Sequence, residues 1–138
     1  MTLTSDSWLT LIVSLPSASA TARMRIWRAV KALGCAALRD GAYLLPAQAE
    51  QAAQLQMLAD DALQEGGQAW LLQVQALDLA EQATFQALFD RTADYTPWLE
   101  ELAQARQTLS ALSAAELQRT QRKHARAYEV IRKIDFFP

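Results

Sequence analysis

The residues from Trp8 to Pro46 contain the pattern of a strand, a helix and a hairpin in that order, and this order strongly restricts the possible folds. Apolar side chains alternate with mixed ones through residues 8–15, which predicts a strand with one face in the core. The core-facing side chains are Leu9, Leu11, Val13 and Leu15. Pro16 ends this strand, and apolar residues at helical spacing predict a helix that Gly34 terminates.

A hairpin follows the helix. Residues 35–39 and 42–46 are apolar runs separated by Asp40-Gly41. This dipeptide is typical of a tight hairpin turn in which both residues have a positive φ. A second helical pattern then covers residues 48–65, and a fourth strand is expected at residues 68–76.

The predicted order is therefore β-α-β-β-α-β, which indicates an α+β protein with a ferredoxin-like, four-stranded antiparallel sheet and both helices on one face. The alternative is a winged helix-turn-helix in which the hairpin forms the wing. A winged helix has three helices before its wing, whereas only one helical pattern precedes this hairpin. The ferredoxin-like arrangement is thus preferred.

The remaining residues predict a C-terminal helical extension. Helices are expected at residues 80–91, from Thr96-Pro97 to about residue 109, and at residues 114–133. Proline is favoured at the first position of a helix, and Ser113 with Glu116 fits a capping box. We expect a core of residues 8–77 and an extension of residues 78–138 that packs on it as one structural unit.

The charges are unevenly distributed along the chain. Residues 1–47 carry five basic and two acidic side chains, residues 48–118 two basic and eleven acidic, and residues 119–138 six basic and two acidic. The two ends are basic and the middle is acidic, although the whole chain has a net charge of −2. This pattern predicts an anionic partner at one or both ends, or electrostatically steered self-association.

Two helical segments are candidate nucleic-acid surfaces, because clustered cations bind phosphates and a planar side chain can contact sugar or base. The candidates on the first helix and its hairpin are Arg23, Arg25, Trp27, Arg28, Lys31 and Arg39. Those on the last helix are Arg119, Arg122, Lys123 and Arg126. The alternative for both segments is a solvated helix face, with Trp27 at the edge of the core.

Several functions are not expected. The sequence has no Ser/His/Asp or Cys/His signature and no glycine-rich phosphate loop, so we predict no catalytic residues, no cofactor and no enzymatic activity. One cysteine and one histidine cannot build a structural zinc site, and no metal is predicted. No segment is long enough to span a membrane. A signal peptide has basic residues before its apolar run, and no basic residue precedes the first apolar run here. We expect a cytoplasmic protein.

Four segments carry a resemblance to a known family. They are LIVSLP, ATARMRIWRAVKALGCAALRDGAYLLP, FQALFDRTADY and RKIDFFP. Together they resemble the N-terminal domain of ChrB, the regulator of bacterial chromate-resistance operons, from Trp8 to Pro138. The helix and hairpin form the most specific part of the resemblance.

The resemblance implies a transcriptional repressor that binds double-stranded operator DNA and is released by chromate. It would assign the cations of the first helix, Trp27 and Arg39 to DNA contact, and this domain is often described as a winged helix. We expect a homodimer on a two-fold operator, and arginines could also bind an oxyanion effector. The alternative is a protein-interaction or dimerisation module without DNA contact, in which Trp8, Ile12, Phe136 and Phe137 would make the contact.

Overall fold

The computed structural model describes residues 7–138 and divides the chain into two compact units. One unit extends to Phe89 and includes Phe136–Pro138, and the other is Asp90–Asp135. The strands are β1 (Ser7–Ser14), β2 (Ala36–Arg39), β3 (Ala42–Pro46) and β4 (Gln68–Gln75). The α-helices are α1 (Ala20–Ala32), α2 (Gln54–Gln64), α3 (Leu79–Ala87), α4 (Thr92–Gln107) and α5 (Ala114–Lys133). Short 3₁₀ helices lie at Glu50–Ala53 and Leu109–Ala111.

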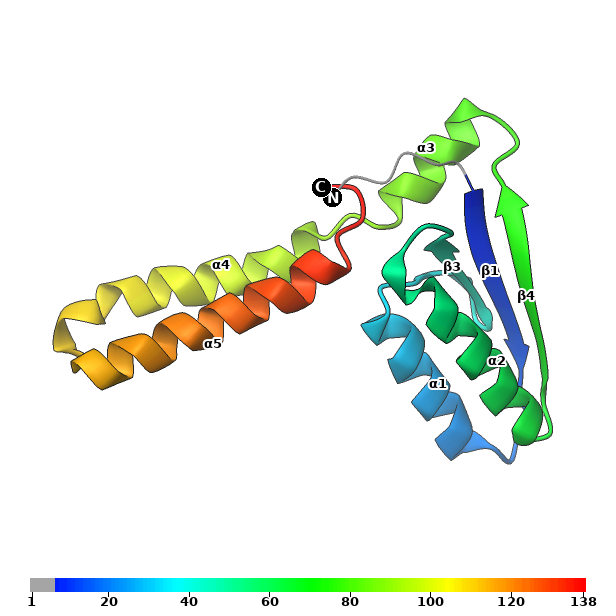
Figure 1. The fold of residues 1–138 in the computed structure, drawn as a ribbon, viewed down its shortest axis with the longest axis horizontal. Helices are drawn as coiled ribbons and strands as arrows, with labels where there is room; N and C mark the ends of the chain where they lie inside the picture. Colours follow the sequence, from blue (N-terminus) through cyan, green and yellow to red (C-terminus); the bar gives the residue numbers. More distant parts are fainter. Residues whose placement is uncertain (1–6) are drawn as a thin grey trace. The chain divides into compact units, whose positions relative to one another are not determined.

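The first unit is built on a four-stranded antiparallel sheet with the order β2-β3-β1-β4. Helices α1 and α2 lie side by side on one face of this sheet (Figure 1). This is the ferredoxin-like arrangement that the β-α-β-β-α-β order predicts. A full strand and a single helix precede the hairpin, so the winged-helix alternative does not describe the observed elements.

The core between the sheet and the two helices follows the alternation of β1. Leu11 is completely buried, and it lies opposite Tyr43 on β3 and Leu71 on β4. The helices bury alanine and branched aliphatic residues against this face: Ala22, Ile26 and Val30 from α1, and Leu55, Ala59 and Ala62 from α2. The small residues allow the helices to approach the sheet closely.

The opposite face of the sheet is partly covered by α3 and the last residues of the chain. Trp8 is completely buried there, stacks on Phe89 at 5.6 Å between ring centroids, and contacts Phe85 and Phe137. Its indole Nε1 donates a hydrogen bond of 2.9 Å to Gln82 Oε1. The expectation that Trp8 and Phe136 form an external contact surface is therefore wrong, because their exposed fractions are only 0 % and 6 %.

The hairpin turn differs from the predicted geometry. Gly41 has a φ of +80°, but within residues 7–138 no residue other than glycine has a positive φ, so Asp40 does not. Instead, a β-bulge between Ala37 and Arg39 inserts one extra residue into β2 next to the turn. Longer hairpin turns of this kind need a positive φ at only one residue. The Gly41 carbonyl accepts a hydrogen bond of 2.7 Å from the Val13 N–H, which ties the turn to β1.

The boundaries of α3 and α4 also differ from the prediction. Helix α3 ends at Ala87, and α4 begins at Thr92, so Pro97 lies inside the second turn of α4 rather than at its start. Asp90 Oδ1 accepts hydrogen bonds from Thr92 N–H and Thr92 Oγ1, and this local turn orders the chain around the N-cap residue Arg91, five residues before Thr96. Proline removes one hydrogen bond there, and α4 continues.

The predicted start of the last helix is confirmed. Ser113 Oγ accepts a hydrogen bond from Glu116 N–H at 3.2 Å, at the N-terminus of α5. Helices α4 and α5 lie side by side as an antiparallel hairpin that makes up the second unit (Figure 1). Helix α3 belongs to the unit of the sheet. No helix between residues 7 and 138 is both apolar and long enough to cross a bilayer.

Candidate nucleic-acid interface

Arg25 lies on the side of α1 that faces α2, where its charge is neutralised. Its Nε and Nη2 donate hydrogen bonds of 2.9 and 2.7 Å to the two carboxylate oxygens of Asp61, and Nη2 also donates to Glu65 Oε1 at 3.1 Å. The hydrogen bond from Arg25 lowers the pKa of Asp61 and raises the pKa of Arg25 itself. A phosphate would have to compete with two carboxylates for this guanidinium group.

The other cations of α1 have different surroundings. Arg23 Nη2 donates a hydrogen bond of 3.2 Å to the carbonyl of Pro16, at the end of the first strand. Lys31 Nζ lies 4.9 Å from the centre of the Trp27 ring, in a cation–π contact one helical turn away. Arg28 is exposed and has no ion pair with any residue that the structure describes. The four cations of α1 therefore do not form one uniform surface.

Arg39 is separated from α1 by the sheet. It pairs with Ala42, which in turn pairs with Ile12 on β1, and directly paired residues project to the same face. Ile12 alternates with Leu11 and Val13, whose side chains face α1 and α2. The register thus places Arg39 on the sheet face opposite the helices, and it does not join the cations of α1 as the sequence pattern suggested.

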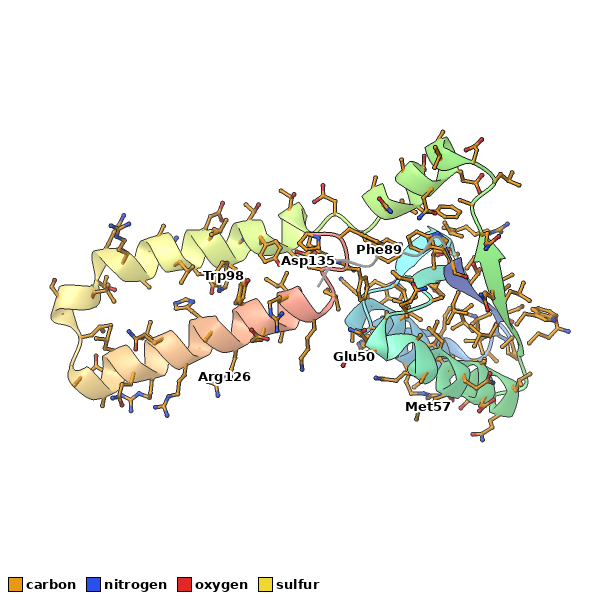
Figure 2. All side chains as sticks on the ribbon, turned by 45° about the horizontal axis from the view of Figure 1, so that its top comes forward. Glu50, Met57, Phe89, Trp98, Arg126 and Asp135 are labelled. Carbon is orange, nitrogen blue, oxygen red and sulfur yellow. The ribbon has the colours of Figure 1, made fainter. Side chains whose placement is uncertain are left out.

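The candidates on α5 form a regular row. Arg119, Arg122, Lys123 and Arg126 are spaced i, i+3, i+4 and i+7, which places them on one face of the helix. All four are exposed, and none pairs with an acidic side chain among the described residues. Figure 2 shows Arg126 on the side of α5 that points away from α4. We call these four residues the cationic stripe.

The opposite face of α5 packs on α4 and fixes the direction of the stripe. Trp98 lies between the two helices (Figure 2), and its Nε1 donates a hydrogen bond of 3.0 Å to the carbonyl of His124. Its ring is 5.1 Å from that of Tyr128. His124 is 9 % exposed and packs on this inner face, as predicted, and its Nδ1 has no hydrogen-bond partner among the described residues.

The base of the helical hairpin is held by polar contacts. Tyr95 Oη donates a hydrogen bond of 2.8 Å to Asp135 Oδ2, and Arg91 Nε donates one of 2.9 Å to the carbonyl of Ile134. Burial, followed by the neighbouring Asp135, raises the pKa of Tyr95 to about 12. The tyrosine thus stays neutral as a donor over the whole physiological range, and the two ends of the hairpin remain joined.

Each candidate cation therefore has a defined place. The four on α5 come together on one face, whereas those of α1 divide between the α2 side, the hairpin side and the solvent. Sequence reasoning missed Met24 and Tyr43, which lie with Trp27 around a cavity. Their signal in the sequence was weak, because an apolar residue on a basic helix face and a tyrosine in a strand are both common.

The fold and the exposed cations define a ferredoxin-like domain that carries a helical hairpin with a cationic face. A family model described as "Protein ChrB, N-terminal" matches residues 23–129. The chain belongs to this family, and the resemblance seen in the sequence is confirmed. It is 54 % identical over 132 residues to Protein ChrB of Cupriavidus metallidurans. This alignment covers 96 % of the chain but only 41 % of that relative, and no solved structure matches the chain.

Proposed function

We propose that this chain is the DNA-binding domain of a transcriptional repressor that controls chromate-resistance genes in the cytoplasm. The cationic stripe on α5 is the observation that carries the proposal. Arg119 and Arg126 are seven residues apart, so the stripe is about 10 Å long. One strand of duplex DNA advances about 3.4 Å along the duplex axis per phosphate, so a stripe parallel to that axis spans about three intervals and matches about four successive phosphates.

The cations of α1 would make a second, weaker contact. Arg28 and Lys31 are exposed on α1, and Trp27 lies beside Lys31. Arg25 contributes less, because Asp61 and Glu65 already neutralise it. Arg39 lies on the other face of the sheet and would contact DNA only if the duplex reached that face.

We further propose that the domain acts as a homodimer on a two-fold operator, since two copies would present two cationic stripes to two half-sites. An oxyanion effector such as chromate would compete with phosphate for the same guanidinium groups. Release from DNA would then follow from occupation of the arginines, or from the part of the longer relative that this chain does not match.

The alternative is a protein-interaction or dimerisation module without DNA contact. The observation that favours it is the exposed apolar surface of β4, where Trp70 and Leu72 are 49 % and 45 % exposed. Such a module would lose its partner when these side chains are removed, whereas a DNA-binding domain would lose affinity when the cationic stripe is neutralised.

Neutralising the stripe tests the proposal. Each phosphate contact contributes about one unit to the slope of log K against log salt concentration. We expect Arg122→Gln to make this slope less steep by about one, and the combined variant with Arg119→Gln, Lys123→Gln and Arg126→Gln by about four. Fluorescence anisotropy of labelled operator DNA measures both the affinity and the slope.

Arg106→Gln provides the matched control. Arg106 is an exposed arginine on α4, in the same unit but outside the stripe. It should leave affinity and slope unchanged, and circular dichroism shows whether each variant keeps its helices. Equal losses in Arg106→Gln and Arg122→Gln would mean that only the net charge matters, and the stripe would not be the interface.

A further inference from the structure

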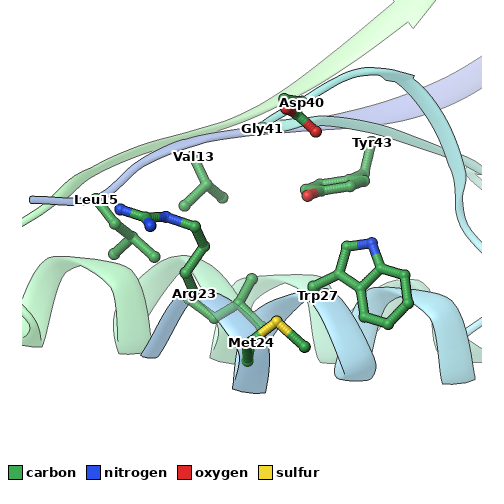
Figure 3. A pocket seen from close by; sticks show the side chains of 9 residues that line it. Val13, Leu15, Arg23, Met24, Trp27, Asp40, Gly41 and Tyr43 are labelled. Atoms are coloured by element: carbon green, nitrogen blue, oxygen red, sulfur yellow. The ribbon is translucent and has the colours of Figure 1, made fainter. Parts of the chain in front are cut away.

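A cavity of about 420 Å³ lies between α1 and the β2–β3 hairpin (Figure 3). Val13 and Leu15 line it from β1 and the residues after it, Met24 and Trp27 from α1, and Tyr43 from β3. Small-molecule sites are commonly mostly apolar cavities of about 300–1,000 Å³. The volume of this cavity therefore suits a molecule of one or two rings.

The walls of the cavity leave apolar surface in contact with water. Met24 and Trp27 are 46 % and 44 % exposed, although both border the same hollow. Figure 3 shows the Tyr43 ring on the hairpin side of the cavity and the Trp27 indole on the helix side. A flat ring placed against these side chains would remove apolar surface from water and gain aromatic contacts.

The charges around the cavity are mainly positive. Arg23 lines it, and among residues 7–138 only its Nη2 is engaged, in the hydrogen bond to the Pro16 carbonyl. Lys31 lies over the Trp27 ring and adds a second positive charge nearby. Asp40 is the single acidic side chain among the described residues that line the cavity. A cationic ligand would be repelled by Lys31 at the face of the Trp27 ring. An anionic ligand could instead accept hydrogen bonds from the guanidinium N–H groups of Arg23 that Pro16 does not engage.

We infer that this cavity binds a small aromatic anion, with its rings between Trp27 and Tyr43 and its carboxylate or similar group on Arg23. The Asp40 carboxylate can accept a hydrogen bond from a donor elsewhere on the ligand. This site uses α1 and the hairpin, whereas the proposed main DNA contact is on α5. Ligand binding and DNA binding can therefore fail separately, and the inference does not depend on the proposed function.

The test is a titration of the ¹⁵N-labelled 138-residue chain with 2-naphthoate, followed by amide chemical shifts. We expect saturable shifts confined to α1, the end of β1 and the hairpin. The neutral 2-naphthamide, which has the same rings without the charge, should bind about tenfold more weakly because it lacks the charge-assisted hydrogen bond. Arg23→Gln should remove this difference between the acid and the amide.

Trp27→Ala and Trp70→Ala form a matched pair. Both tryptophans are about half exposed and belong to the same unit, but Trp70 is on β4 and does not line the cavity. Trp27→Ala should weaken 2-naphthoate binding about tenfold through the lost stacking, and Trp70→Ala should leave it unchanged. The dispersion of the amide spectrum reports that both variants are folded.

Three results would overturn the inference. The first is an absence of saturable shifts in the folded wild-type chain. The second is equal weakening by Trp27→Ala and Trp70→Ala, which would indicate nonspecific binding to exposed aromatic side chains. The third is equal affinity of the wild-type chain for 2-naphthoate and 2-naphthamide, which would remove the role of Arg23.

Discussion

Arg25 and Arg28 are three residues apart on α1, but they differ in their electrostatic surroundings. Arg25 is held by Asp61 and Glu65 of the neighbouring α2 segment, while Arg28 has no ion pair among the described residues. The sequence placed both among the candidate cations of the first helix, and both side chains are exposed. It could not predict the pairing, because Asp61 is 36 residues from Arg25 and only the packing of two helices brings them together.

The Arg25–Asp61 pair predicts that the stability of the folded protein depends on pH. The folded pKa of Asp61 lies below its ordinary value of 3.8 because Arg25 donates hydrogen bonds to the carboxylate. The resulting stabilisation is complete above the pKa of the unfolded chain and is lost as the pH falls through the lower, folded pKa. We expect Arg25→Gln to return the pKa of Asp61 toward its ordinary value, as measured by carboxyl ¹³C chemical shifts.

Arg28→Gln is the control for this titration. It removes the same charge from the same helix but leaves the hydrogen bonds to Asp61 in place, so the pKa of Asp61 should stay low. A pKa near 3.8 in the wild-type protein would contradict the ion pair.

At the scale of the elements, periodicity predicted the existence and type of every strand of the sheet. The alternating residues 8–15 correspond to β1, and the Asp-Gly dipeptide forms the hairpin turn. The start of α4 was missed because proline was given more weight than the local turn that the Asp90 side chain makes with Thr92. The bulge before Arg39 was also missed, since nothing in a run of apolar residues distinguishes a bulged residue from a paired one.

The two glycines that end α2 allow a prediction about this connection. Gly66 has a φ of +82°, but a Cβ there would meet nothing closer than 4.0 Å. At Gly67 a Cβ would collide with the Ser14 carbonyl and press on the Ala62 carbonyl at 3.1 Å. Gly66→Ala should therefore cost about 1 kcal/mol for the left-handed backbone, and Gly67→Ala about 3 kcal/mol for the backbone shift.

Chemical denaturation monitored by tryptophan fluorescence measures both glycine variants. The close approach of Gly67 to β1 requires that Gly67→Ala be the less stable of the two. A Gly66→Ala variant that is equally or more destabilised would show that conformational strain, and not the contact with Ser14, determines this connection.

At the scale of the whole chain, the charge pattern has a structural basis. Each unit pairs a basic helix with an acidic neighbour: α1 packs beside α2, which carries Asp60 and Asp61, and α5 beside α4, which carries Glu100 and Glu101. In the first unit the pairing neutralises Arg25. In the second unit the cationic stripe points away from α4, and its four side chains remain exposed to solvent. The sequence predicted two basic segments and the resemblance favoured the first, but only three-dimensional packing shows which of their cations are neutralised.

Binding of the 138-residue chain to the DNA upstream of its own gene, measured across a range of salt concentrations beside a scrambled duplex, tests the central claim most directly. The account predicts tighter binding to the upstream DNA than to the scrambled duplex. It also predicts a slope of log K against log salt concentration of about −4 per protomer, from the four cations of the stripe. A folded protein that binds neither duplex, or whose affinity does not change with salt, would contradict a DNA-binding function.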